Sequence, residues 1–172
     1  MSVIMENEEN VDTQTQTESS AVTEASAATQ KALALLARCE QCRAGMERKL
    51  LQKGYSKAVV SGVLDALEEK GFLSDERFAR AWLNSRRIGK AEGRTRLLAE
   101  LSARGISKEI SKKAVDDFFE EFSEEEICAK AARKFLSQGK SGEKLMASMT
   151  RAGFSWKLAS AAVKELSGNE IN

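Results

Sequence analysis

Apolar positions recur at helical spacing along most of the chain, and the pattern itself repeats about every 50 residues. Three glycines, Gly54, Gly105 and Gly153, lie 51 and 48 residues apart. Each has an apolar residue four positions before it, and is followed by an apolar residue, a serine and an apolar set on one helical face. Because a left-handed glycine ends a helix and a serine begins one, each repeat predicts a helix, a tight turn and a second helix.

A further apolar and polar segment precedes each helix pair and predicts a third helix in every repeat. These segments read ATQKALALLARCEQC, SDERFARAWLNSRR and SEEEICAKAARKFLSQ, and the last begins with a capping-box spacing from Ser123 to Glu126. Proline, which would interrupt helices, is absent from all 172 residues. We expect an all-α fold of three tandem three-helix repeats that form an elongated, curved helical stack, because one repeat is too small to bury its own apolar face.

The predicted domain boundaries follow the same pattern. Residues 1–26 are rich in Ser, Thr, Gln and Glu and lack aromatic residues, so we expect a disordered acidic tail there. The alternative is that the alanines of this segment join the first helix, which then begins a few residues earlier. Repeat 1 is expected at residues 27–73, repeat 2 at residues 74–122 and repeat 3 at residues 123–168.

The net charge of +1 hides an uneven distribution of charged residues. Residues 77–113 hold eleven basic and three acidic residues, whereas residues 114–126 hold seven acidic residues and no basic one. Blocks of this kind produce local fields that steer charged partners. The basic block is therefore the first candidate for a binding surface.

Within the basic block, the segment RRIGKAEGRTR connects two predicted helices. On the helix before it, arginines and Asn84 recur at i, i+3, i+7 and i+10, which places them on one stripe away from Phe78 and Trp82, both expected in the core. We define the basic ridge as Arg77, Arg80, Arg86, Arg87, Lys90, Arg94 and Arg96. Arginine suits bidentate recognition of phosphate and carboxylate groups, and no acidic residue interrupts the stripe. We predict that the ridge contacts nucleic-acid phosphates or an acidic protein surface; the alternative is a solvated helix face.

The sequence predicts no catalytic, cofactor-binding or metal-binding residue. Histidine is absent, so a nucleophile with a histidine base is excluded. Cys39 and Cys42 have the spacing of a redox or zinc motif, but zinc needs about four ligands and Cys128 is the one other cysteine. We interpret the pair as two residues inside a helix.

Cysteine number and hydropathy indicate a cellular location. Three cysteines are an odd number, which argues against a disulfide framework and favours a reducing compartment. No apolar run approaches the roughly 20 residues that cross a bilayer, and the first residues lack the pattern of a signal peptide. We expect a cytoplasmic protein with no membrane partner.

The run SDERFARAWLNSRRIGKAEGRTRLLAELSARGIS resembles the central signature of the RecX family, the regulatory proteins of the RecA recombinase. The matching positions are Asp75, Phe78, Ala79, the basic residues around Arg86, Gly93 and the turn ELSARGIS. The segment RKLLQKGYS and the later VLDALEEKGFLSDERFA match upstream of it. The similarity spans about residues 31–167.

The resemblance implies a non-enzymatic modulator in homologous recombination and DNA repair. Such proteins bind RecA, occupy the groove of its filament on DNA, and restrain strand exchange and the coprotease activity that triggers the SOS response. Single-stranded DNA is then a partner through the filament, and a monomer is expected. The alternatives are a stand-alone helical protein that binds DNA phosphates without sequence specificity, and a helical adaptor for an unrelated protein.

Overall fold

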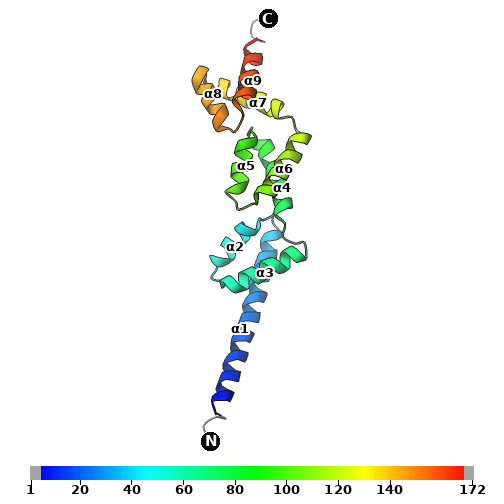
Figure 1. Cartoon of the computed structure of the whole chain (residues 1–172), viewed down its shortest axis with the longest axis vertical. Helices are drawn as coiled ribbons and strands as arrows, with labels where there is room; N and C mark the ends of the chain where they lie inside the picture. Colours follow the sequence, from blue (N-terminus) through cyan, green and yellow to red (C-terminus); the bar gives the residue numbers. More distant parts are fainter. Residues whose placement is uncertain (1–4, 169–172) are drawn as a thin grey trace. The chain divides into compact units, whose positions relative to one another are not determined.

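The computed structural model describes the backbone of residues 5–168 and the side chains of residues 20–87 and 90–166. Its helices are α1 (Met5–Leu36), α2 (Arg43–Leu51), α3 (Lys57–Glu69), α4 (Asp75–Gly89), α5 (Arg94–Ser102), α6 (Lys108–Glu121), α7 (Glu124–Ser137), α8 (Gly142–Arg151) and α9 (Trp156–Gly168) (Figure 1). No strand occurs among the described residues, which confirms the predicted all-α class. Contacts divide the chain between Ser74 and Asp75 into unit 1, which contains α1–α3, and unit 2, which contains α4–α9.

The three glycine turns share one backbone geometry, which confirms the repeat predicted from their spacing. Gly54, Gly105 and Gly153 have φ angles of 90°, 85° and 94°, in the left-handed region that glycine adopts readily. In each turn the amide of the residue after the glycine donates to the carbonyl of the residue four positions before the glycine. The N···O distances are 3.4, 3.2 and 3.3 Å. The apolar side chain at that earlier position is fully buried in all three repeats.

Serine begins the helix after each turn, but in two different ways. The hydroxyls of Ser107 and Ser155 accept a hydrogen bond from the amide three residues later, each at 3.2 Å, as a helix cap does. Ser56 instead donates its amide and its hydroxyl to the carboxylate of Glu24, at 2.5 and 3.2 Å. The start of α3 is therefore tied to α1 rather than closed by its own serine.

Helix α1 corrects the prediction of a disordered tail over residues 1–26. The chain is helical from Met5 onward, and the first four residues lie outside those that the structure describes. Alanine, glutamate and glutamine favour helices, and no proline or glycine interrupts this segment. Glu24 bonds to α3 and Ala25 packs against the core of unit 1, so the alternative that the alanines extend the first helix is the one that the structure supports.

The pair Cys39 and Cys42 lies between helices, which corrects the interpretation that it sits inside one. Helix α1 ends at Leu36, and α2 begins at Arg43, directly after the buried Cys42. The guanidinium of Arg43 donates to Asp65 of α3 at 2.6 Å. This long-range ion pair anchors α2 as a separate helix and leaves the cysteines in the connection.

In unit 2, two backbone hydrogen bonds join the start of α5 to the turn before α9. The amide of Gly93 donates to the carbonyl of Ala152 at 2.8 Å, and the amide of Thr95 donates to the carbonyl of Gly153 at 3.2 Å. A Cβ atom on Gly93 would lie 2.5 Å from the carbonyl oxygen of Gly153, so the approach of the two chains requires glycine. The helices α4–α6 and α7–α9 are joined at this contact.

The helices follow the predicted threefold grouping, with α1–α3, α4–α6 and α7–α9 as successive sets. The contacts, however, separate two units rather than three, because α4–α9 form one of them. The division into repeats at residues 27–73, 74–122 and 123–168 therefore stays a prediction.

Candidate functional site

Helix α4 carries basic side chains on its exposed face and apolar side chains on the opposite one. Arg77, Arg80 and Arg87 are exposed. Ala79 and Leu83 are 0% and 1% exposed, so they belong to the core. The exposed positions follow the helical spacing from which the stripe was predicted.

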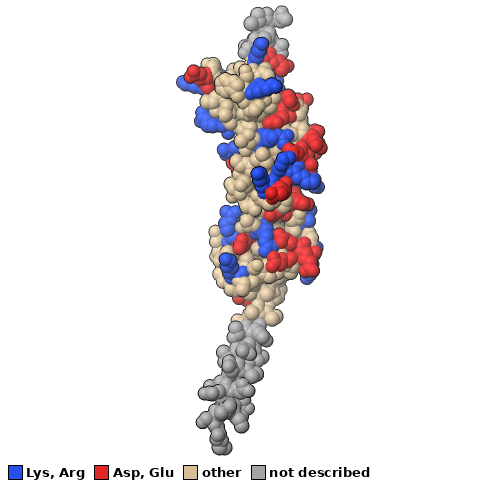
Figure 2. Space-filling model, viewed as in Figure 1, with Lys and Arg blue, Asp and Glu red and all other residues tan. Residues whose placement is uncertain are grey.

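Acidic residues of α6 border this face, a feature that the sequence of α4 does not reveal. A groove of about 100 Å³ is lined on the α4 side by Glu76 and Arg80, and on the α6 side by Lys113, Asp117 and Glu121. Figure 2 shows basic and acidic atoms adjoining one another in many places on the described surface. The stripe is therefore bordered by charges of both signs.

Ion pairs inside unit 2 hold the Arg86 side chain away from the exposed face of α4. Its side chain is 18% exposed, with Nε 3.3 Å from Glu92 Oε2 and Nη2 3.5 Å from Glu100 Oε2. Its guanidinium lies 4.8 Å from the ring centre of Trp82, which is half-buried rather than enclosed in the core as predicted. This side chain therefore stabilises the connection between α4 and α5 and is mostly buried, and its contact with a partner stays a prediction.

Glu100 of α5 contacts arginines of α4, of α5 and of the turn after α5. It accepts a hydrogen bond from Arg104 at 2.8 Å and pairs with Arg96 at 2.6 Å, and Arg86 lies beside it. The hydrogen bond from Arg104 is the largest cause that lowers the pKa of Glu100, and the charges of Arg96, Arg104 and Arg86 act in the same direction. The spacing of Glu100 four residues from both Arg96 and Arg104 was the sequence signal for these pairs. Arg96 is thus paired, although its side chain stays 48% exposed.

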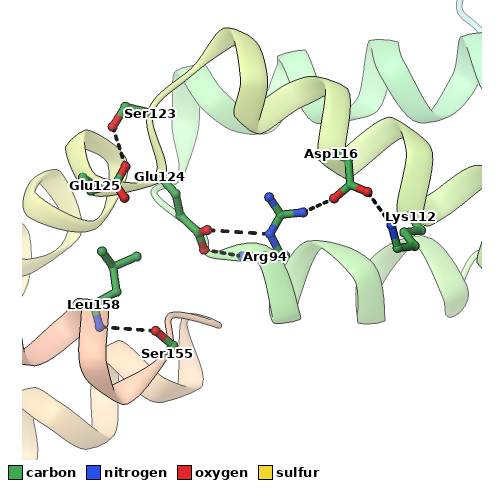
Figure 3. Close-up of polar contacts among 8 residues, drawn as sticks. All are labelled: Arg94, Lys112, Asp116, Ser123, Glu124, Glu125, Ser155 and Leu158. Atoms are coloured by element: carbon green, nitrogen blue, oxygen red, sulfur yellow. Dashed lines mark hydrogen bonds and ion pairs between the residues drawn. The ribbon is translucent and has the colours of Figure 1, made fainter.

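Arg94 joins three helices of unit 2 (Figure 3). Its guanidinium forms a short ion pair with Asp116 of α6 and lies 3.7 Å from Glu124 Oε2 of α7, and its amide donates to Glu124 Oε1 at 3.2 Å. Asp116 also accepts from Lys112 at 2.7 Å, and this hydrogen bond is the first cause that lowers the pKa of Asp116. Phe119 lies 5.0 Å from the Arg94 guanidinium. These contacts hold α5 against α6 and α7, and a contact of Arg94 with a partner stays a prediction.

Arg87 and Lys90 remain on the surface. The guanidinium of Arg87 lies 4.3 Å from the ring centre of Phe122, and both cations line a hollow of about 660 Å³ beside α7. We name the exposed cations of α4 and of the connection directly after it the exposed basic face. Its members are Arg77, Arg80, Arg87 and Lys90.

Metal binding and thiol chemistry are the other two possibilities that the cysteines raise. Among the side chains that the structure describes, no group of three or more His, Cys, Asp or Glu residues could hold a metal ion. Burial, with the nearby charges of Glu124 and Glu125, raises the pKa of the Cys128 thiol to about 11. Cys128 therefore stays protonated at neutral pH and acts as a core residue. Over the described residues, no helix has the length and hydropathy of a membrane span.

Two family models match the chain in tandem. A model described as "RecX, first three-helix domain" matches residues 28–67, and one described as "RecX, second three-helix domain" matches residues 74–115. The matched ranges contain the first two glycine turns and the whole of α4. The second range contains every member of the exposed basic face.

Individual proteins of the same description resemble this chain over a larger part of its length. A "Regulatory protein RecX" of Treponema pallidum (strain Nichols) is 37% identical over 124 residues, which cover 72% of this chain and 76% of that protein. The "Regulatory protein RecX" of Pelodictyon phaeoclathratiforme is 30% identical over 141 residues, which cover 78% and 86%. The crystal structure of RecX from Lactobacillus salivarius shares the fold, with a TM-score of 0.73 and 20% identity over 85% of this chain and 98% of that one. The tandem helical domains and these similarities together show that the chain belongs to the RecX family.

Proposed function

We propose that this chain modulates the RecA recombinase, mainly as a negative regulator, by occupying the groove of the RecA filament on DNA. The relatives are regulatory proteins by name, which supports a regulatory role. The observation that carries the proposal is the exposed basic face, with three arginines and one lysine at solvent-exposed positions of a rigid helix and the turn after it. These cations suit phosphate or carboxylate groups of a polyanionic partner.

Occupation of the groove would restrain strand exchange and SOS coprotease activity by excluding a second DNA or a protein substrate. Many modest contacts made at once add through their shared geometry, so affinity for a filament should exceed affinity for one RecA subunit. The mechanism needs no catalytic group. It places the chain in the cytoplasm with the DNA on which the filament forms.

A binding comparison tests the partner. We expect tight binding to RecA-coated single strands and weak binding to bare single strands at the same ionic strength. A stand-alone DNA-binding protein would bind both, with log affinity falling by about 0.7 per neutralised phosphate for each tenfold rise in salt. An adaptor for an unrelated protein would bind neither.

A charge reversal tests the exposed basic face. We expect Arg80→Glu with Arg87→Glu to raise the concentration that inhibits RecA-driven ATP hydrolysis by about tenfold or more, because two contacts of about 1 kcal/mol each are lost and replaced by repulsion. Circular dichroism and urea unfolding check that the fold is retained.

The matched control is Lys57→Glu with Lys108→Glu. These two exposed lysines begin α3 and α6, so the control changes the net charge equally and places acids where helix starts favour them. Retained inhibition by the Arg80 and Arg87 variant would reject the proposal. Equal loss in the control would mean that net charge, not this face, is responsible.

A further inference from the structure

A second group of cations surrounds a cleft inside unit 2, where the connection between α4 and α5 meets α7 and α8. The cleft has a volume of about 340 Å³. Its basic lining residues are Lys90, Arg96, Lys134, Lys140 and Arg151. They come from the α4–α5 connection, α5, α7, the α7–α8 connection and α8, so no linear spacing in the sequence reveals the group.

Acidic residues offset only part of the positive charge in this cleft. Arg96 is paired with Glu100 at 2.6 Å, outside the lining. Among the lining residues that the structure describes, Glu92 is the one acid, and its carboxylate is 12% exposed and paired with Arg86 at 3.3 Å. The groove between α4 and α6 has three acids against two bases. The hollow beside α7 also carries acids, with Glu125, Glu126 and Glu165 in its lining. The cleft is therefore a place where an anion meets an unbalanced field.

Internal contacts hold several of these cations in position without neutralising them. The Lys140 ammonium lies 4.4 Å from the ring centre of Phe135. The Nε of Arg151 donates to the carbonyl of Ala147 at 3.3 Å, which orients the guanidinium along α8. Lys90 and Lys134 are exposed at the rim. Positions fixed in this way lower the entropic cost of binding an anion.

The cleft extends beyond the dimensions of a single ion. An adjoining hollow of about 500 Å³ shares Lys140, Ser148 and Arg151 with it. It adds Lys144 of α8, and one acid, Glu143, also lines it. Cations thus follow one another over two connected depressions. This arrangement matches a row of negative groups better than one isolated anion.

We propose that this cleft binds a chain of phosphate groups. Lysine binds phosphate as a point charge and arginine as a fork of donors, and both are present here. Small residues, Ala131, Ser148 and Ala152, lie between the cations, and the aromatic residue of the lining, Phe135, is covered by Lys140. The cleft therefore recognises the phosphates and not the bases of a nucleic acid. A soluble oligophosphate and a nucleic-acid backbone offer this same chemistry.

The test uses the full chain without recombinase, so that it is independent of the proposed function. The probes are a fluorescein-labelled oligothymidylate, followed by anisotropy, and inorganic tripolyphosphate, followed by calorimetry. The variant is Lys134→Ala with Lys140→Ala, two cleft lysines that do not belong to the exposed basic face. The control, Lys108→Ala with Lys164→Ala, removes two exposed lysines that line none of the hollows described above and gives the same net charge.

We expect the Lys134 and Lys140 variant to bind the oligothymidylate roughly 25-fold more weakly at about 0.1 M salt, because each lost phosphate contact lowers the logarithm of the affinity by about 0.7 at that salt concentration. The slope of log affinity against log salt should become shallower by about 1.4. The control should stay within about twofold of the unmodified chain, since its lysines lie away from the cleft.

The two probes separate the sources of phosphate. If the cleft variant loses binding of oligothymidylate alone, the ligand is a nucleic-acid backbone. If it loses binding of tripolyphosphate alone, the ligand is a soluble oligophosphate. If it loses binding of both probes, the cleft accepts phosphate chains from either source. The proposal is overturned if the unmodified chain binds neither probe, or if the control pair weakens binding as much as the cleft pair. Inhibition of RecA that survives such a result leaves the proposed function standing.

Discussion

The ion-pair network around Arg86 and the exposed basic face around Arg87 show how neighbouring arginines acquire different roles. Arg86 is 18% exposed and lies between Glu92 and Glu100, whereas the next residue, Arg87, is exposed. One residue along an α-helix is a rotation of about 100°, enough to move a side chain from an interior ion pair to solvent. A run of basic residues therefore indicates a binding surface only after the acids brought close by the fold are known.

The largest expected difference between the two arginines is in the free energy of unfolding of their alanine variants. We expect Arg86→Ala to lower the free energy of unfolding by about 3 kcal/mol, because it leaves the carboxylate of Glu92 mostly buried without its partner. Arg87→Ala should cost less than about 1 kcal/mol, the scale of an exposed cation–π contact. Urea unfolding of both variants gives the two values. Equal losses would mean that the two arginines do not differ as described.

A smaller loss should follow removal of the ring that supports the network. Trp82 lies 4.8 Å from the Arg86 guanidinium and 4.7 Å from that of Arg104. We expect Trp82→Ala to destabilise by about 2 kcal/mol, since two cation–π contacts and part of an apolar surface are lost. Trp82→Phe keeps an aromatic ring and should lose less than half of that amount. Thermal unfolding that is unchanged in Trp82→Ala would contradict this role.

The smallest expected effect is the pH dependence of the stability that Glu100 contributes. The pKa of Glu100 is lowered from its ordinary value of 4.5, so its contribution to stability is present above about pH 4.5 and is lost as pH falls through the lowered pKa. We expect Glu100→Gln to cost about 1 kcal/mol at neutral pH, a modest value because solvent screens the pairs. The difference from the unmodified chain should shrink toward zero in acid.

Urea unfolding of both chains across the acid range measures this difference. Glu109→Gln, at an exposed position of α6, is the matched control and should leave the pH dependence unchanged. A difference between Glu100→Gln and the unmodified chain that stays constant with pH would mean that the glutamate is not held by its arginines.

Much of the fold could be predicted because its signals are local. A glycine, an apolar residue and a serine in succession specify a turn whose bonds lie within a few residues, and all three turns have the predicted geometry. The start of α1 was missed because its polar composition was interpreted as disorder, while the alanines that pack against unit 1 lie at its far end.

The candidate site was harder to predict because its decisive contacts are not local. The pairs that Glu100 forms with Arg96 and Arg104 follow from their i,i+4 spacing. The pair of Arg94 with Asp116 joins residues 22 positions apart, and only the packing of α5 on α6 brings them together. The cations of the phosphate-chain cleft are similarly assembled from several helices.

The contact between Gly93 and Gly153 has a consequence for how this family can diverge. The hydrogen bonds there connect main-chain atoms, so nearly every neighbouring side chain can be exchanged without altering the distance between α5 and the turn before α9. A Cβ at either of the two glycines would force them apart. Evolution can therefore vary the charges on the cleft walls while the walls keep their spacing, so that ligand preference can change without a change of architecture.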